Sequence, residues 1–151
     1  MQYEEVRCAQ GQGGPRVSFG QRIRAFYTAL RAANTERVFV CACDMPFVHV
    51  DLIRHLDDRM GDYDAVVPRD TQGLQPMHGL YSSRILPALE ARLAADDLKI
   101  EHFVDSIDAL ILSPEEVSSI DPLGIAFMNV NTPEDVVAAN RWATRVDEES
   151  R

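Results

Sequence analysis

Apolar residues recur at intervals of three and four positions along much of the chain, and this spacing predicts amphipathic helices. In the first such segment, Ile23, Phe26 and Leu30 fall on one face of a helix. The segments 113–116 and 132–135 each place a hydroxyl residue at the N-cap, proline at the first helical position and a carboxylate at the third. Helices are therefore predicted over 21–33, 50–60, 84–95 and 98–107, and after Ser113 and Thr132.

Short apolar runs lie between these helices and predict strands at 38–43, 65–67, 77–81, 109–112 and 125–128. The run from Val38 to Cys43 is continuously apolar, which is typical of a strand buried on both faces of a parallel sheet. Helices that alternate with such strands predict an α/β fold, namely a three-layer, Rossmann-like nucleotide-binding sandwich with a mostly parallel sheet.

Composition limits the kinds of protein that the chain can be. Its 151 residues fit one domain, which we expect over 21–146, with an irregular or disordered segment over 1–20 and a frayed tail over 147–151. A net charge of −9 without a basic stripe argues against nucleic-acid binding. The absence of a long apolar run or a signal peptide argues against a membrane partner. Three cysteines, an odd number, favour a reducing cytoplasmic location.

Three groups of polar residues follow predicted strands, where ligands of open α/β sheets bind. Asp44 follows the most apolar strand and could ligate Mg²⁺, or it could serve only to form a turn or cap the next helix. Asn129 and Asn131 offer two amides to a polar heterocycle or a phosphate, although asparagines also form turns before capped helices.

The third group is the polar loop that ends at a predicted strand. Gln75 can both donate and accept hydrogen bonds at the edge of a base or pterin. His78 is either a ligand or base, or a histidine satisfied within its strand. Cys41 and Cys43 are interpreted as small buried apolar residues, because no further soft ligands lie at a zinc-site spacing.

The segments that carry these residues resemble one known family, the molybdenum cofactor guanylyltransferases. They are Ala42-Cys43-Asp44-Met45-Pro46-Phe47, Gln75-Pro76-Met77-His78-Gly79-Leu80-Tyr81 and Asn129-Val130-Asn131-Thr132-Pro133-Glu134-Asp135. The resemblance extends from about Phe26 to Trp142. The related cytidylyltransferases tend to carry Asp-x-Asp in place of Asn129-Val130-Asn131, so the resemblance favours guanylyl transfer.

The resemblance implies a nucleotide-binding α/β sandwich that transfers GMP from Mg-GTP to molybdopterin and releases pyrophosphate. Asp44 then matches the aspartate that binds Mg²⁺ beside the GTP phosphates, while Asn129 and Asn131 match asparagines on the acceptor side. Gln75 and Pro76 match the acceptor-side loop. GTP and molybdopterin would be the small-molecule partners, and a molybdoenzyme or a protein of cofactor biosynthesis would be a protein partner.

The chain departs from the family in its first residues. The family has an N-terminal loop, Leu-Ala-Gly-Gly-x-Ser-x-Arg-Met-Gly-x-Asp-Lys, that wraps the nucleotide phosphates, whereas here the only lysine is Lys99. We therefore expect an N-terminally truncated transferase with little GTP turnover. Two alternatives stay open: a non-catalytic pterin-binding or partner-binding module, and a related cytidylyltransferase. A receiver-like signalling domain fits poorly, because no upstream acidic pair accompanies Asp44.

Overall fold

A five-stranded sheet forms the middle layer of the protein, whose computed structural model describes residues 18–149. The strands are β1 (Arg37–Cys41), β2 (Ala65–Asp70), β3 (Gly73–Leu74), β4 (His78–Ser82) and β5 (Ala109–Leu112). Strand β4 pairs with both β1 and β2, and β2 pairs in addition with β3 and β5. The α/β class is thus confirmed.

The expected mostly parallel sheet is wrong, and a Rossmann-like sandwich is not confirmed. Strand β4 is antiparallel to β1 and β2, and the β2–β3 pair is also antiparallel. Among the strand pairs of residues 18–149, only β2 and β5 are parallel. The reason is the short connection 71–77 between β2 and β4, because a parallel crossover needs about a dozen residues or more. Strands β1, β2 and β5 nevertheless point the same way, so their carboxyl ends share one edge.

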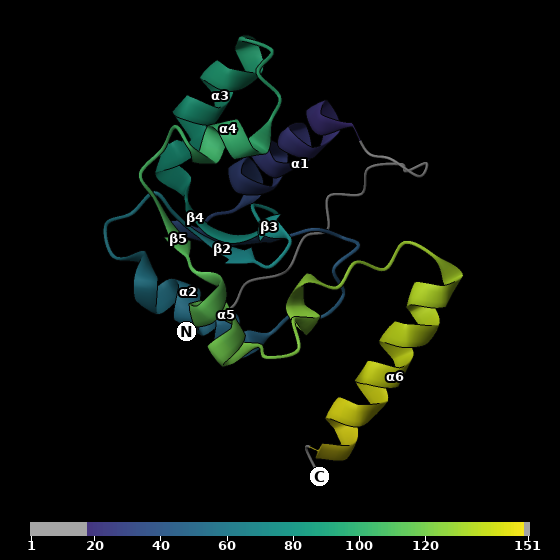
Figure 1. The fold of residues 1–151 in the computed structure, drawn as a ribbon. Helices are drawn as coiled ribbons and strands as arrows, with labels where there is room; N and C mark the ends of the chain where they lie inside the picture. The colour runs from purple at the N-terminus through teal and green to yellow at the C-terminus, as the bar shows by residue number, and fades with distance from the viewer. Residues whose placement is uncertain (1–17, 150–151) are drawn as a thin grey trace.

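Helices cover both faces of the sheet (Figure 1). The helices are α1 (Phe19–Ala32), α2 (Val50–Met60), α3 (Leu86–Ala94), α4 (Ile100–Val104), α5 (Pro114–Ile120) and α6 (Pro133–Glu149). Helices α1, α3 and α4 cover one face, α2 and α5 cover the other, and α6 extends away from these layers. Among the residues described, no helix combines the length and apolar character needed to cross a membrane.

Each face of the sheet has its own apolar core. On one side Phe26 of α1 packs edge-on against Tyr81 of β4, with ring centroids 4.7 Å apart. On the other side Leu52 and Leu56 of α2 pack with Val66 of β2. Strand β2, rather than the run from Val38 to Cys43, is the strand buried on both faces.

The run from Val38 to Cys43 differs from its prediction because β1 pairs only with β4 in the described part of the chain. Val40 is the buried residue of β1, while Val38 and Phe39 are half-buried. Cys41 is also half-buried and Cys43 is exposed, which corrects the interpretation of both cysteines as buried apolar residues.

Other element boundaries differ where side chains cap the backbone. Helix α1 begins at Phe19 after the Ser18 cap, and the rest of the expected irregular segment, 1–17, lies outside the described residues. The predicted helix 98–107 is helical only over α4. The predicted helix 84–95 begins as a 3₁₀ turn at Ser83–Ile85 and continues as α3. Helix α6 reaches Glu149, and the end of the expected frayed tail, 150–151, is also outside the description.

The predicted strand 125–128 is wrong, since Ile125–Phe127 forms a 3₁₀ turn. The carboxylate of Asp121 accepts hydrogen bonds from the N–H groups of Ile125 (3.1 Å) and Ala126 (2.8 Å). Gly124, in the left-handed region with φ of 63°, turns the chain toward that carboxylate. These contacts satisfy the backbone locally, so the segment needs no neighbouring strand.

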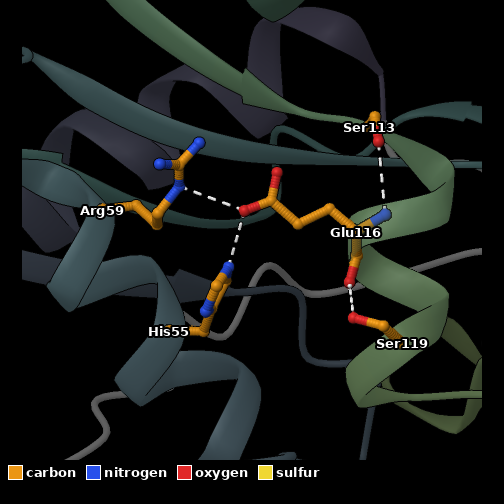
Figure 2. Close-up of polar contacts among 5 residues, drawn as sticks. All are labelled: His55, Arg59, Ser113, Glu116 and Ser119. Carbon is orange, nitrogen blue, oxygen red and sulfur yellow. Dashed lines mark hydrogen bonds and ion pairs between the residues drawn. The ribbon is translucent and has the colours of Figure 1, made fainter.

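Helices α2 and α5 are joined by one carboxylate, shown in Figure 2. Glu116 of α5 places Oε1 2.7 Å from Nε2 of His55 and 3.1 Å from Nε of Arg59, both on α2. The backbone N–H of Glu116 is in turn capped by the Ser113 hydroxyl. This cluster fixes α5, and therefore the segment that follows it, against the α2 face of the sheet.

Candidate functional site

Two backbone hydrogen bonds bring the three candidate segments together at the carboxyl end of β1. The N–H of Ala42 donates to the carbonyl of Met77 at 2.9 Å, which joins the end of β1 to the loop containing Gln75. The N–H of Val130 donates to the carbonyl of Asp44 at 2.7 Å, which joins the asparagine segment to the same place. Residues far apart in the sequence thus border one region of the surface.

Asp44 lies in a tight turn directly after β1. The N–H of Met45 donates to the carbonyl of Ala42 at 3.0 Å and closes the turn, with the Met45 side chain buried beneath it. Asp44 does not cap the next helix, because His49 takes that place and accepts the N–H of Leu52 at Nδ1. The half-buried Asp44 carboxylate has no hydrogen bond or ion pair with the described residues.

The Asp44 carboxylate fits a magnesium ion that is bound mainly by phosphates. In the described part of the chain, no three His, Cys, Asp or Glu side chains gather as a complete metal site. Mg²⁺ in nucleotide sites is held by one or two carboxylates, with phosphate and water oxygens supplying the remaining ligands. Among the described residues, Asp44 could therefore contribute one ligand to Mg²⁺ that phosphate and water oxygens also bind.

The loop of Gln75 and Pro76 is held by the strands on both sides of it. The N–H of Gln75 donates to the Pro68 carbonyl at 2.9 Å, and the N–H of His78 donates back to the Gln75 carbonyl at 3.0 Å. The buried phenol of Tyr81 donates to the Pro76 carbonyl at 2.6 Å. Burial raises the pKa of Tyr81, so the phenol keeps the proton that it donates. The Gln75 amide is left without a hydrogen bond to the described residues.

We expect Tyr81→Phe to lower the free energy of unfolding by about 1–2 kcal/mol, because the Pro76 carbonyl loses its buried donor. Urea denaturation would measure the change, with Tyr63→Phe as the control, since Tyr63 is exposed. Equal midpoints for the two variants would show that the Tyr81–Pro76 hydrogen bond does not hold the loop.

Asn129 and Asn131 are both exposed, on either side of the residue that bonds to Asp44. The Asp135 carboxylate accepts the N–H groups of Asn131 and Thr132 at 3.0 and 2.9 Å, and these bonds lower the pKa of Asp135. The predicted cap of the last helix is confirmed, because the Thr132 hydroxyl accepts the N–H of Asp135. The backbone of the pair is thus fixed, while neither side-chain amide has a hydrogen bond to the residues that the structure describes.

His78 lies fully buried directly behind the site. Its ring packs edge-on between Phe39 and Phe127, with centroids 5.0 and 5.1 Å away, and its Nδ1 is 3.7 Å from the Cys41 sulfur. Burial is the main cause that lowers the pKa of His78 to about 4, so the ring is neutral at physiological pH. The predicted position of His78 within a strand is confirmed. Its hydrogen-bonding capacity is not fully used, since Nε2 has no hydrogen-bond partner among the described residues.

Two comparisons with curated proteins identify relatives of this chain. It is 34% identical over 127 residues to the probable molybdenum cofactor guanylyltransferase of Pelotomaculum thermopropionicum, covering 84% of this chain and 62% of that protein. It is 29% identical over 114 residues to the molybdenum cofactor guanylyltransferase of Desulfosudis oleivorans, covering 75% and 56% of the two chains. This chain therefore spans about three-fifths of the length of these relatives.

A solved structure has a similar fold over most of this chain. The crystal structure of molybdopterin-guanine dinucleotide biosynthesis protein A from Archaeoglobus fulgidus superposes with a TM-score of 0.69 at 26% identity, over 82% of this chain and 63% of that one. Residues 16–110 also match the family described as the MobA-like NTP transferase domain. The chain thus belongs to the family of MobA-like nucleotidyltransferases.

Proposed function

We propose that the protein takes part in the transfer of GMP from Mg-GTP to molybdopterin, with release of pyrophosphate. The observation that carries the proposal is the backbone hydrogen bond from Val130 to Asp44, which brings the asparagine pair beside a carboxylate that has no partner among the described residues. Family membership supports the same reaction class, nucleotidyl transfer. The product would pass to a molybdoenzyme or another protein of cofactor biosynthesis in the cytoplasm.

The proposed roles follow from the chemistry of each side chain. Asp44 would hold Mg²⁺ beside the triphosphate, where the ion neutralises charge on the phosphates. A phosphate oxygen of molybdopterin would attack the α-phosphorus of GTP, and the bond to the leaving pyrophosphate would break. Asn129, Asn131 and Gln75 offer amide donors and acceptors that would orient the acceptor for this attack. Pro76 would set the shape of the acceptor-side loop.

A second candidate function is pterin binding without catalysis. It is favoured by the composition of the site, because the segments 42–47, 75–81 and 129–135 contain neither lysine nor arginine. Phosphoryl-type transfer depends on positioning and charge neutralisation, for which lysine and arginine are the usual protein groups. On this second candidate, the asparagine pair and the Gln75 loop would bind molybdopterin and no nucleotide would be consumed.

A single-turnover assay with protein in excess over molybdopterin tests the proposal, because even slow transfer then accumulates product. We expect the guanine dinucleotide by mass spectrometry and matching pyrophosphate release with Mg-GTP, and no product when either substrate is omitted. Product formed in preference with CTP would assign the protein to the cytidylyltransferases. Molybdopterin that is bound but never modified would contradict transfer and support the second candidate.

A further inference from the structure

A hollow lies beside the site, at the shared edge where β2 and β5 end. Its volume is about 390 Å³, and it is bounded by the turn 70–72 after β2 on one side and by α5 with the segment 121–128 on the other. That volume falls within the range of about 300–1,000 Å³ typical of small-molecule pockets. None of the roles given above to Asp44, the asparagine pair or Gln75 makes use of it.

Two residues that line the hollow lie close in sequence to the acceptor-side residues. Met128 lines it and directly precedes Asn129, the first residue of the asparagine pair. Gln72 also lines it, at the start of the loop that leads to Gln75. The hollow therefore adjoins, along the chain, both acceptor-side segments.

The walls of the hollow combine apolar and polar surface, with two carboxylates and no basic side chain among the lining residues. Val117 and Phe127 supply apolar surface. Asp121 is only 4% exposed, and both of its oxygens already accept backbone N–H groups. Asp70 differs, because Oδ1 accepts the N–H groups of Gln72 and Gly73 while Oδ2 accepts no hydrogen bond from the described residues.

This lining selects one kind of ligand group. A flat ring can pack on the apolar wall, and N–H donors on its edge can pair with the unengaged oxygen of Asp70. A phosphate would be repelled by two carboxylates in a partly desolvated space. The hollow thus favours a donor-bearing heterocycle and disfavours the phosphate end of the same molecule.

We propose that the hollow holds the pterin ring of the acceptor, with the N–H donors of its aminopyrimidinone edge directed to Asp70. The proposal rests on the proposed function and adds an orientation to it. The ring lies between the walls that carry Asp70 and Asp121, and the phosphate lies toward Asp44, where a divalent ion would attract it. On this proposal, acceptor specificity is determined by Asp70, Phe127 and Ser118.

The test uses pterin itself, a fluorescent probe without phosphate, and omits both nucleotide and divalent ions. Ser118 lines the hollow from α5, and Ser118→Phe fills it. Ser119→Phe is the matched control, because Ser119 is the next residue of α5, is also exposed and also donates to the carbonyl three residues before it (Figure 2). We expect Ser118→Phe to weaken pterin binding at least about tenfold, and Ser119→Phe to change it less than about twofold.

A second variant keeps the experiment decisive if the larger side chain disturbs folding. Asp70→Asn retains one oxygen for the turn and replaces the unengaged oxygen with an amide nitrogen, so pterin affinity should fall about fivefold or more. Circular dichroism melts of each variant confirm that the fold is intact. Equal pterin affinity of Ser118→Phe and Ser119→Phe, or no pterin binding by the folded wild-type chain, would overturn the proposal.

The dinucleotide assay separates this proposal from the transfer reaction. If both serine variants transfer GMP to molybdopterin at the same rate, the proposed function is supported. The same result would contradict the placement of the pterin ring in the hollow. Selective loss of pterin binding in Ser118→Phe, together with no nucleotide transfer by the wild-type chain, would support the pterin site and contradict transfer.

Discussion

Replacing Asp44 with asparagine is expected to weaken the binding of Mn²⁺–GTP by about 10- to 100-fold, the loss that follows removal of a group supporting a metal site. The substitution keeps the size of the side chain and removes its charge. Mn²⁺ serves as a paramagnetic substitute for Mg²⁺, since both prefer oxygen ligands. The electron paramagnetic resonance signal of free Mn²⁺, titrated with protein at fixed GTP, reports the affinity directly.

The matched control for this experiment is Asp62→Asn. Asp62 is an exposed aspartate that precedes β2, so it lies at the edge of the sheet opposite to the Asp44 turn. The Asp62→Asn substitution removes the same unit of charge from the protein, and therefore corrects for any general electrostatic effect on Mn²⁺–GTP binding. If both variants bind Mn²⁺–GTP as tightly as the wild-type chain, Asp44 is not a ligand of the ion.

Between pH 7 and pH 5, His78 is expected to account for a fall of about 2 kcal/mol in the free energy of unfolding. The folded ring has a pKa of about 4, whereas an unfolded histidine titrates near 6.5. In this window the unfolded state binds the proton and the folded state does not, so stability decreases as the pH falls. The loss continues toward pH 4, below which the folded ring is protonated as well.

Urea denaturation at several pH values measures this dependence. The variants His78→Leu and His78→Gln both lack the titrating group. Between pH 7 and pH 5 the free energy of unfolding of each variant should therefore fall about 2 kcal/mol less than that of the wild-type chain, whatever its value at pH 7. His102→Gln is the control, because His102 is exposed on α4 and lies 3.5 Å from Asp97. A pH dependence that persists unchanged in both His78 variants would show that another group causes it.

Much of the element pattern could be predicted from the spacing of apolar residues and from capping residues. The helix 50–60 is found with the predicted bounds, and the caps at Ser113 and Thr132 begin α5 and α6 as expected. The predicted strand 109–112 matches β5. These features are local, and a few neighbouring residues determine each of them.

The direction of β4 could not be predicted from its apolar pattern, because parallel and antiparallel strands can bury the same residues. The signal was instead the length of the connection 71–77, which is too short for a crossover. The segment 125–127 was misassigned for a similar reason. Three apolar residues fit a strand or a 3₁₀ turn equally well, and the deciding contact is made by the carboxylate of Asp121.

The candidate site could be predicted as a set of residues but not as an arrangement. Asp44 and Gln75 were chosen because they follow or precede strands, and their chemical roles stay predictions. Asn129 was placed after a strand that does not exist, yet it lies at the site because Val130 bonds to the Asp44 carbonyl. The unpartnered Nε2 of His78 and the hollow beside Asp70 depend on contacts between distant segments, which no local pattern reports.

The insertion of β4 between β1 and β2 also affects how the chain reaches its native state. The hairpin 65–82 closes over a short connection, which costs little loop entropy, and local pairings of this kind form early. Strand β1 can join only after 42–77 has been brought into place, and this longer closure is the slower step. The hairpin is therefore the expected folding nucleus, and the Asp44 turn becomes ordered only when the late pairing of β1 with β4 is complete.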